Sequence, residues 1–582
     1  MWNTLLLLIE RRALCGADFG CRLLLRRKRV PRLDFLPDRD DNAQADTHDW
    51  QKRLPYHFSF YHGRCESAIH WYCYNGIELS GRGQQSADEA AHLFLLGLSA
   101  FWGILDRGSF LGKGTVHPGP SENPQETAPS NSQPQSPGER GLRYGLRDGA
   151  CQAVTQGSGE QYLSAFALLL HASPFQLSVL SALPQLVGTV AQLLSVKVLQ
   201  WFPNRKALIS AGTVGQALAW FPIVLLPLVL PQWGSWLVVG GAAAYFACAH
   251  FTAPAWNSLI VDWLGQHERG AYFARRAKII AGLSFFALCG AGWILSLWQQ
   301  SDAAWWGFVL IFVLAGSARI LSVMALSPVQ DVHPTSHQEA QQGFGGFFRL
   351  GATKDFRRFL VFSGLMHASV LVAGPFFVLY LLQDIHLSYI GYGGWLATGL
   401  LGQLLAVQAW GHFGDRFGNK ALLSITGFTV PFLPMLYLVS TNLGFLLVVS
   451  FLGGVIWAGL GLGLQNYVFD SVRPADRAKA IALYSTVNAI GWSMGALFGS
   501  WLVEHLPARI EWGGVILQPA SNLPFVFFLS GVLRLLVSSS LLGSFHEARQ
   551  VERAPRRQLL WELPLVKPIA QFVAWTLPKF NR

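Results

Sequence analysis

The chain has 582 residues, of which 51% are hydrophobic and only 13% are charged, and its formal net charge is +11. Soluble domains carry about 25% charged residues, so this composition excludes an ordinary soluble enzyme or binding module. A positive charge can indicate nucleic-acid binding. In a chain with many long apolar runs, however, it is typical of basic cytoplasmic loops, so we expect a polytopic membrane protein that binds no nucleic acid.

The N-terminal part of the chain differs in composition from the rest. Residues 1–118 are expected to form a cytoplasmic extension for which the sequence predicts no fold, and a start assigned too far upstream is an alternative interpretation. Residues 119–148 include a polar segment rich in proline and serine, GPSENPQETAPSNSQPQSPGERG, which predicts a disordered linker.

Apolar runs long enough to cross a bilayer follow one another between residues 149 and 543. Lipid offers no hydrogen-bond partner to the backbone, so these runs should be helices. Twelve spans are expected, near 149–170, 174–199, 207–230, 234–260, 278–298, 304–326, 357–382, 388–410, 421–440, 443–467, 480–503 and 523–543. The predicted fold is an all-α polytopic membrane protein with two six-helix bundles, 149–326 and 357–543, joined by a cytoplasmic loop at 327–356. Residues 544–582 are predicted to be a basic cytoplasmic tail at the membrane interface.

The distribution of basic residues predicts the orientation of these spans. If both ends of the bundle are cytoplasmic, the outer loops carry only Arg509. The inner loops then carry fifteen cations: Arg205, Lys206, Arg269, Arg275, Arg276, Lys278, Arg349, Lys354, Arg357, Arg358, Arg416, Lys420, Arg473, Arg477 and Lys479. The positive-inside rule therefore places both termini in the cytoplasm.

The two groups of six spans contain related sequences. Asp262 precedes Arg269 by the same interval as Asp470 precedes Arg477, 208 residues later. The sixth and twelfth spans carry similar segments, LAGSARIL and LSGVLRLL. This pattern predicts an internal duplication. The arginines of these two segments, Arg319 and Arg534, either extend to the membrane interface or pair with acids at neighbouring helix ends.

A compact charged segment, GHFGDRFGNK at Gly411–Lys420, separates the eighth and ninth spans. Gly411, Gly414 and Gly418 permit close packing and a tight turn, and Lys420 suits a cytoplasmic loop. The segment resembles the loop signature of the major facilitator superfamily, commonly G-x-x-x-D-R-x-G-R-K, with Asn419 in place of the second basic residue. The chain is thus similar to twelve-helix secondary transporters of that superfamily.

The resemblance implies a cytoplasmic latch between the two bundles. Asp415 would cap the start of the fifth helix, where a carboxylate is favoured by the helix dipole, and Arg416 would reach Asp470. Asp262 and Arg269 would play the equivalent role in the first half, after the fourth span. Arg477 would act beside Asp470 in the second half. The first-half copy, VLQWFPNRKAL, lacks the signature aspartate, so the latch would be one-sided. The alternative interpretation is that these residues only fix helix packing and topology.

Glu160 is the strongest candidate for substrate or proton binding. It lies near the middle of the first span, where an ionised carboxylate is costly unless it is paired or faces a water-filled cavity. Gln156 lies one turn before it. His367, in the seventh span, could titrate near neutral pH. For Glu160 the alternative is a packing hydrogen bond with Gln156 or Tyr162, and for His367 a structural donor.

These features predict a secondary active transporter that moves a small organic solute by alternating access, coupled to protons. The alternatives are a transport-fold sensor or channel and, least favoured, a membrane-embedded enzyme, since no HExxH or GxSxG motif is present. An amide-rich cavity with few charges would suit a neutral or cationic solute. We expect no cofactor or metal, a small-molecule substrate, membrane lipid as the other partner, a monomer, and location in the cell (inner) membrane.

Overall fold

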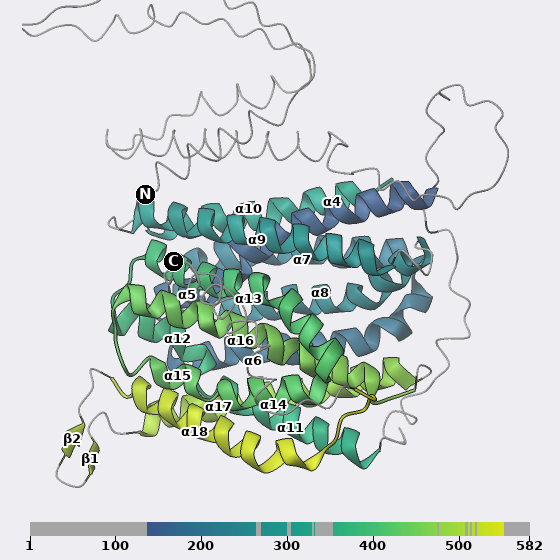
Figure 1. Cartoon of the computed structure of the whole chain (residues 1–582). Helices are drawn as coiled ribbons and strands as arrows, with labels where there is room; N and C mark the ends of the chain where they lie inside the picture. Colours follow the sequence, from purple (N-terminus) through teal and green to yellow (C-terminus); the bar gives the residue numbers. More distant parts are fainter. Residues whose placement is uncertain are drawn as a thin grey trace, which may run out of the picture. The chain divides into compact units, whose positions relative to one another are not determined.

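The computed structural model describes residues 137–263, 269–299, 304–328, 331, 353–473, 476–506, 510–512, 515–517 and 521–551. The predictions for residues 1–118, for most of the loop 327–356 and for most of the tail 544–582 lie outside these residues. The described part is all-α apart from one short hairpin (Figure 1).

As far as the structure describes it, the first half of the bundle consists of seven α-helices and three short 3-10 turns. Its α-helices are α4 (Pro137–Ser158), α5 (Leu163–Leu169), α6 (Pro174–Val198), α7 (Arg205–Val229), α8 (Gly234–Trp263), α9 (Arg269–Trp298) and α10 (Ala304–Leu326). Three 3-10 turns, η3 (Glu160–Tyr162), η4 (Leu199–Trp201) and η5 (Pro231–Trp233), lie between them. Ser173 caps α6 in a reciprocal capping box with Gln176, and Asn204 caps α7 through Ala207 N–H.

The second half repeats this arrangement with more interruptions. Its α-helices are α11 (Lys354–Leu371), α12 (Phe377–Leu379), α13 (Tyr389–Phe417), α14 (Asn419–Thr429), α15 (Phe432–Leu436), α16 (Leu443–Asp470), α17 (Arg477–His505) and α18 (Leu523–Leu541). A 3-10 turn, η8 (Gly374–Phe376), and a π-helical turn, η9 (Tyr380–Asp384), flank α12, and η11 (Leu542–Ser544) follows α18. Strands β1 (Ile510–Trp512) and β2 (Val515–Leu517) form an antiparallel hairpin in which Ile510 pairs with Leu517.

The helices confirm the predicted fold class. Within the described residues, ten helices are long and apolar enough to cross a membrane. The other two predicted spans, the first and the ninth, are interrupted helices: α4 passes through η3 into α5, and α14 is separated from α15 at Pro431. Polar residues weaken the first and a proline breaks the ninth, so both fall short of a continuous apolar helix.

Two predicted boundaries are wrong. Helix α4 begins at Pro137, so residues 137–148 belong to the first helix rather than to the predicted disordered linker. Helix α13 continues to Phe417, so most of the segment 411–420 is helical and only Gly418 forms the turn. Gly418 has a φ of +91°, a backbone angle that residues with a Cβ rarely adopt. Helices α4 and α13 therefore both extend beyond their apolar residues, where they pack against neighbouring helices.

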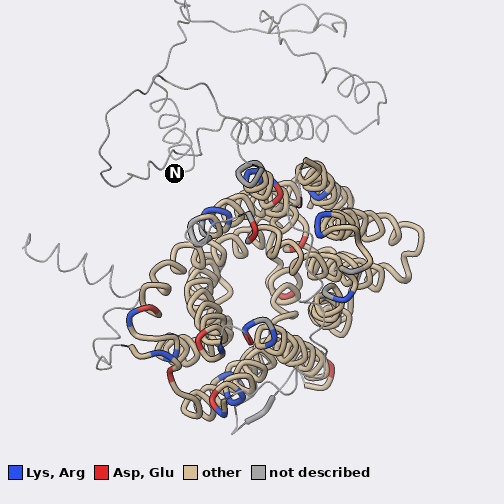
Figure 2. The backbone as a smooth tube through the Cα atoms, turned by 90° about the vertical axis from the view of Figure 1, so that its right-hand side faces the viewer, with Lys and Arg blue, Asp and Glu red and all other residues tan. Residues whose placement is uncertain are grey.

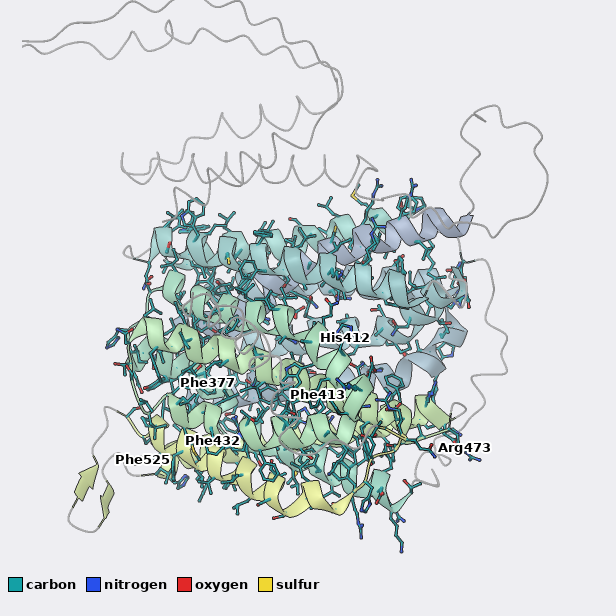
Figure 3. All side chains as sticks on the ribbon, viewed as in Figure 1. Phe377, His412, Phe413, Phe432, Arg473 and Phe525 are labelled. Carbon is teal, nitrogen blue, oxygen red and sulfur yellow. The ribbon has the colours of Figure 1, made fainter. Side chains whose placement is uncertain are left out.

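The two halves meet along two pairs of helices, α6 with α17 and α9 with α13 (Figure 1). A Cβ on Gly292 of α9 would lie 3.3 Å from the Cα of Gly393 of α13, so the two glycines allow these backbones to approach closely. We call the end of the bundle that carries Arg205, Asp415 and Asp470 the basic end, and the end that carries the β-hairpin the aromatic end. Figure 2 looks along the helices from the basic end, and Figure 3 labels Arg473 there.

Candidate functional site

A cavity of about 1590 Å³ lies between the two halves and is lined by residues of both. This volume exceeds the roughly 300–1,000 Å³ of a closed small-molecule pocket. The lining extends to Lys278 of α9 and Gln408 of α13, which are exposed and lie toward the basic end. The cavity therefore opens in that direction.

Aromatic side chains close the cavity at the aromatic end. Tyr162 of η3 makes an edge contact with Tyr392 of α13, with ring centroids 6.0 Å apart, and Phe308 of α10 makes one with Tyr389 at 5.4 Å. Tyr162 Oη also donates a hydrogen bond to Leu288 O at 2.9 Å. These rings belong to one buried cluster that includes residues of both halves. The halves are thus in contact at the aromatic end and separated by the cavity nearer the basic end.

Glu160 lies in the wall of this cavity, at the break between α4 and α5. Tyr245 of α8 donates a hydrogen bond to Glu160 Oε1 at 2.6 Å. Gly159, beside Glu160, has no room for a side chain, because a Cβ there would lie 2.6 Å from the ring of Trp220. Packing therefore fixes the backbone at this break and directs the carboxylate to Tyr245 rather than to Gln156 or Tyr162. A hydrogen bond to a charged carboxylate contributes about 1.5–3 kcal/mol.

Gln156 and His367 line the same cavity, so the structure brings together the three residues predicted for substrate or proton binding. His367 Nδ1 lies 2.8 Å from Ser363 O, and its ring stacks on Trp492 of α17 with centroids 5.8 Å apart. Because a carbonyl oxygen can only accept, Nδ1 carries the proton in this contact. A neutral His367 ring would leave Nε2 as an acceptor.

At the basic end, the residues of the predicted latch surround the turn at Gly418. Asp415 and Arg416 are exposed at the end of α13, and the Arg416 guanidinium lies 4.8 Å from the Phe417 ring centroid. Asp470 accepts a hydrogen bond from Asn419 Nδ2 at 2.6 Å. Arg477 begins α17 and is exposed. The pairing of Arg416 with Asp470 stays a prediction.

The remaining glycines and the lysine of this segment have distinct surroundings. Gly411 is open, since a Cβ there would meet only Leu462, at 4.0 Å. Gly414 is buried, and its carbonyl accepts from Gly418 N at 2.9 Å. Lys420 donates through Nζ to Leu542 O and lies 3.6 Å from the Phe545 ring centroid. Lys420 thus ties the start of α14 to the end of α18.

The segment after α18, residues 544–549, binds across the same turn and we call it the strap. Glu547 accepts a hydrogen bond from Lys420 N at 2.7 Å. Arg549 lies with Nε 3.1 Å from Asp470 Oδ2, and its Nη2 donates to Gly414 O at 3.0 Å. The chain beyond the twelfth helix therefore supplies a cation to Asp470, a contact that no sequence pattern predicts.

The first half has a matching arrangement built on Arg205. Its guanidinium is buried and makes ion pairs of 2.6 Å with Asp262 and with Asp331. Asp331 also accepts from Arg205 N at 2.9 Å, as Glu547 does from Lys420 N. Lys206 Nζ donates to Ser327 O at 2.6 Å, as Lys420 does to Leu542 O. Arg269 begins α9, and its side chain lies outside the described residues.

Arg319 and Arg534 are both buried and do not extend to the membrane interface. Arg319 Nη1 of α10 lies 3.7 Å from Asp148 Oδ1 of α4, and Arg276 Nη2 of α9 lies 3.4 Å from Asp148 Oδ2. Asp148 was not among the predicted site residues, because it precedes the first apolar run by one residue. The similar segments LAGSARIL and LSGVLRLL were the sequence signal that places these two arginines at equivalent positions of the two halves.

The comparisons with known proteins agree with this architecture. Residues 359–577 match the family model of the Major Facilitator Superfamily. A probable peptide/nitrate transporter of Arabidopsis thaliana is 26% identical over 164 residues, 27% of this chain and 30% of that protein. Multidrug resistance protein 1 of Bacillus subtilis is 25% identical over 179 residues, 31% of this chain and 41% of that protein. The matched part therefore spans less than half the length of these relatives.

The solved structure of the nucleoside transporter NupG has a TM-score of 0.54 and 13% identity, covering 71% of this chain and 100% of that one. That of a bacterial homologue of the iron transporter ferroportin, in an inward-facing state, has a TM-score of 0.53 and 14% identity, covering 70% and 98%. At this identity the likeness shows the fold. The helices, the duplicated basic end and the family match define a multi-pass membrane protein of transporter fold. The family match assigns residues 359–577 of this chain to the major facilitator superfamily.

Proposed function

We propose that this protein is a secondary active transporter that moves a small organic solute by alternating access. The observation that carries the proposal is the cavity between the halves, which is closed by aromatic contacts at one end and opens toward the other. Rocking of two six-helix halves about a central site exposes such a cavity to each side of the membrane in turn. The structure would be the state that opens at the basic end.

The basic end faces the cytoplasm in this proposal, and both halves have their termini there. The fifteen cations that the sequence assigns to the inner loops, against one in the outer loops, support that orientation. We place the protein in the cell (inner) membrane as a monomer surrounded by lipid.

The latch would act in the opposite state, when the basic end closes. Asp415 is exposed here, as expected of a latch residue whose partner helix has moved away. In the closed state it would cap the N-terminus of α9, which begins at Arg269, because a carboxylate is favoured at the positive end of a helix dipole. The mirrored group, Asp262, is already paired with Arg205, so Asp415 supplies the latch on one side only.

Glu160 would carry the coupled proton. It lines the cavity at the break in the first helix, and its partner is the hydroxyl of Tyr245. A carboxylate in such a site exchanges a proton whenever water reaches it, and loses contact with bulk water when the cavity closes. Gln156 and His367, in the same wall, would contact the solute.

Uptake into sealed vesicles tests this function. The purified full chain is reconstituted in liposomes, and a panel of radiolabelled metabolites and drugs is offered with and without a pH gradient. A coupled transporter accumulates at least one solute above its equilibrium level only when the gradient is present. Equilibration without accumulation would indicate a channel, and binding without uptake would indicate a sensor.

A further inference from the structure

Arg534 is a buried cation in the wall of the cavity. It lies in the middle of α18 and its surface is only 3% exposed. Nη1 donates to Val430 O at 3.3 Å and Nη2 donates to Val370 O at 3.4 Å, while Nε has no hydrogen-bond partner. Among the described residues, no carboxylate forms an ion pair with Arg534.

The two carbonyl groups that Arg534 contacts belong to broken helices. Pro434 has no N–H, so it cannot donate to Val430 O as a continuous helix would require, and Val370 lies at the end of α11 before the turn η8. Ser538, one turn further along α18, similarly donates to Gly427 O at 2.6 Å, the carbonyl left without a donor by Pro431. Part of the role of Arg534 is therefore structural. Long hydrogen bonds to two neutral acceptors nevertheless leave its charge uncompensated.

The equivalent arginine of the first half is compensated. Arg319 lies beside Asp148, which also pairs with Arg276, and none of the three lines the cavity. The duplication thus placed an arginine in both halves, but within the part of the chain that the structure describes only Arg319 has a carboxylate partner. An unpaired cation in the membrane interior is costly, and such residues mark substrate pathways.

The charges of the cavity wall reinforce this asymmetry. Its charged members are Glu160, Lys278 and Arg534, two cations and one carboxylate. Glu160 already has a hydrogen-bond donor in Tyr245, whereas Arg534 has only neutral acceptors. Other parts of the wall are aromatic, including Phe377, Trp395 and Trp457. In a site of low dielectric an uncompensated cation attracts an anion strongly, even across a few ångströms.

We propose that the solute is an organic anion, an oxyanion such as a carboxylate on an apolar or aromatic body, whose charge is attracted by Arg534. This inference rests on the proposed transport function and names the substrate class. It replaces the neutral or cationic solute expected from the sequence. The bound oxyanion supplies the negative charge that Asp148 supplies to Arg319, and Phe377 and Trp395 contact the apolar body.

Matched pairs of acids and neutral amides test this substrate class. The purified full chain is heated in detergent with benzoate, indole-3-acetate or 2-naphthoate, and separately with the amide of each. We expect at least one acid to raise Tm with increasing concentration and its amide to raise it far less, since a ligand that binds the native state stabilises it. In Arg534→Gln we expect the affinity for that acid to fall by more than about tenfold. Arg534→Lys should retain part of the affinity for that acid.

Ser538→Ala is the control, because it also removes a donor from α18 to a broken helix but leaves the charge in place. It should lower Tm without ligand and keep the preference for the acid. Equal stabilisation by acid and amide in the wild-type protein, or an unchanged preference in Arg534→Gln, would overturn the proposal. If Arg534→Gln does not fold, the wild-type comparison decides alone. Because this binding assay needs no transport, its failure is distinct from a failure of vesicle uptake.

Discussion

The buried guanidinium of Arg205 forms an ion pair of 2.6 Å with Asp262 where α7 begins and α8 ends. In the second half the corresponding helix ends are joined by Asn419 and Asp470, also at 2.6 Å. The Asn419 amide thus forms in the second half the contact that the Arg205 guanidinium forms in the first. The second half adds the cation from the strap, where Arg549 lies 3.1 Å from Asp470.

Replacing Arg205 should destabilise the first half strongly. Arg205→Ala leaves Asp331, with a side chain only 5% exposed, without its guanidinium. Breaking a buried pair in this way costs about 3–5 kcal/mol. Thermal unfolding of the purified variant should show a large fall in Tm. Lys206→Ala, which removes one hydrogen bond to Ser327 O at 2.6 Å, is the neighbouring control and should change Tm little. Equal effects of the two variants would contradict the buried-pair interpretation.

Gly418→Ala should destabilise the turn between α13 and α14. The backbone there has a φ of +91°, and a Cβ would lie 2.2 Å from Glu547 Oε2. Strain of this kind costs about 1–3 kcal/mol. Gly411→Ala is the matched control, since its Cβ would meet only Leu462 Cδ2 at 4.0 Å, and alanine favours the helix. We expect a lower Tm for Gly418→Ala and an unchanged or higher one for Gly411→Ala. The reverse order would refute the role of Gly418.

Much of the fold could be predicted from the sequence because lipid imposes simple rules on length and apolarity. The predicted span 304–326 coincides with α10, and 174–199 differs from α6 by one residue. The start of α4 could not be predicted in this way, since residues 137–148 are polar and their helix depends on partners such as Arg276. Asp148 was missed for that reason.

The site could be predicted only in part. Glu160 was recognisable as a carboxylate inside an apolar span, and it lines the cavity between the halves. Its partner Tyr245 lies 85 residues away, and no periodicity links the two. Arg549 was equally hidden, because its position beside Asp470 depends on how the strap folds back over α14.

Asp415→Asn should reduce transport without changing membrane insertion or abundance. The amide keeps the size of the side chain but removes the charge that the proposed cap on α9 requires. His412→Asn, an exposed change one turn earlier on α13 (Figure 3), is the control and should transport normally. Rates in vesicles, normalised to the reconstituted amount, give the comparison. Wild-type transport in Asp415→Asn would refute the latch.

Glu160→Gln should uncouple transport from the pH gradient. Glutamine can still accept the hydrogen bond from Tyr245, so the break between α4 and α5 should persist, but it cannot carry a proton. We expect exchange of solute across the vesicle membrane to continue and gradient-driven accumulation to stop. Gln156→Ala, one turn away in the same wall, should alter affinity while keeping the response to pH. Normal accumulation in Glu160→Gln would show that another group carries the proton.

The movement of the two halves against each other can be measured directly. Pairs of spin labels on α6 and α17, placed in a cysteine-free background, report distances between the two halves. One pair, at Lys197 and Arg477, reports the basic end, and the other, at Phe175 and Trp501, reports the aromatic end. Alternating access predicts that wild type and Asp415→Asn, with and without solute, populate two states in which one distance shortens as the other lengthens. A single fixed distance at both ends under all these conditions would exclude alternating access.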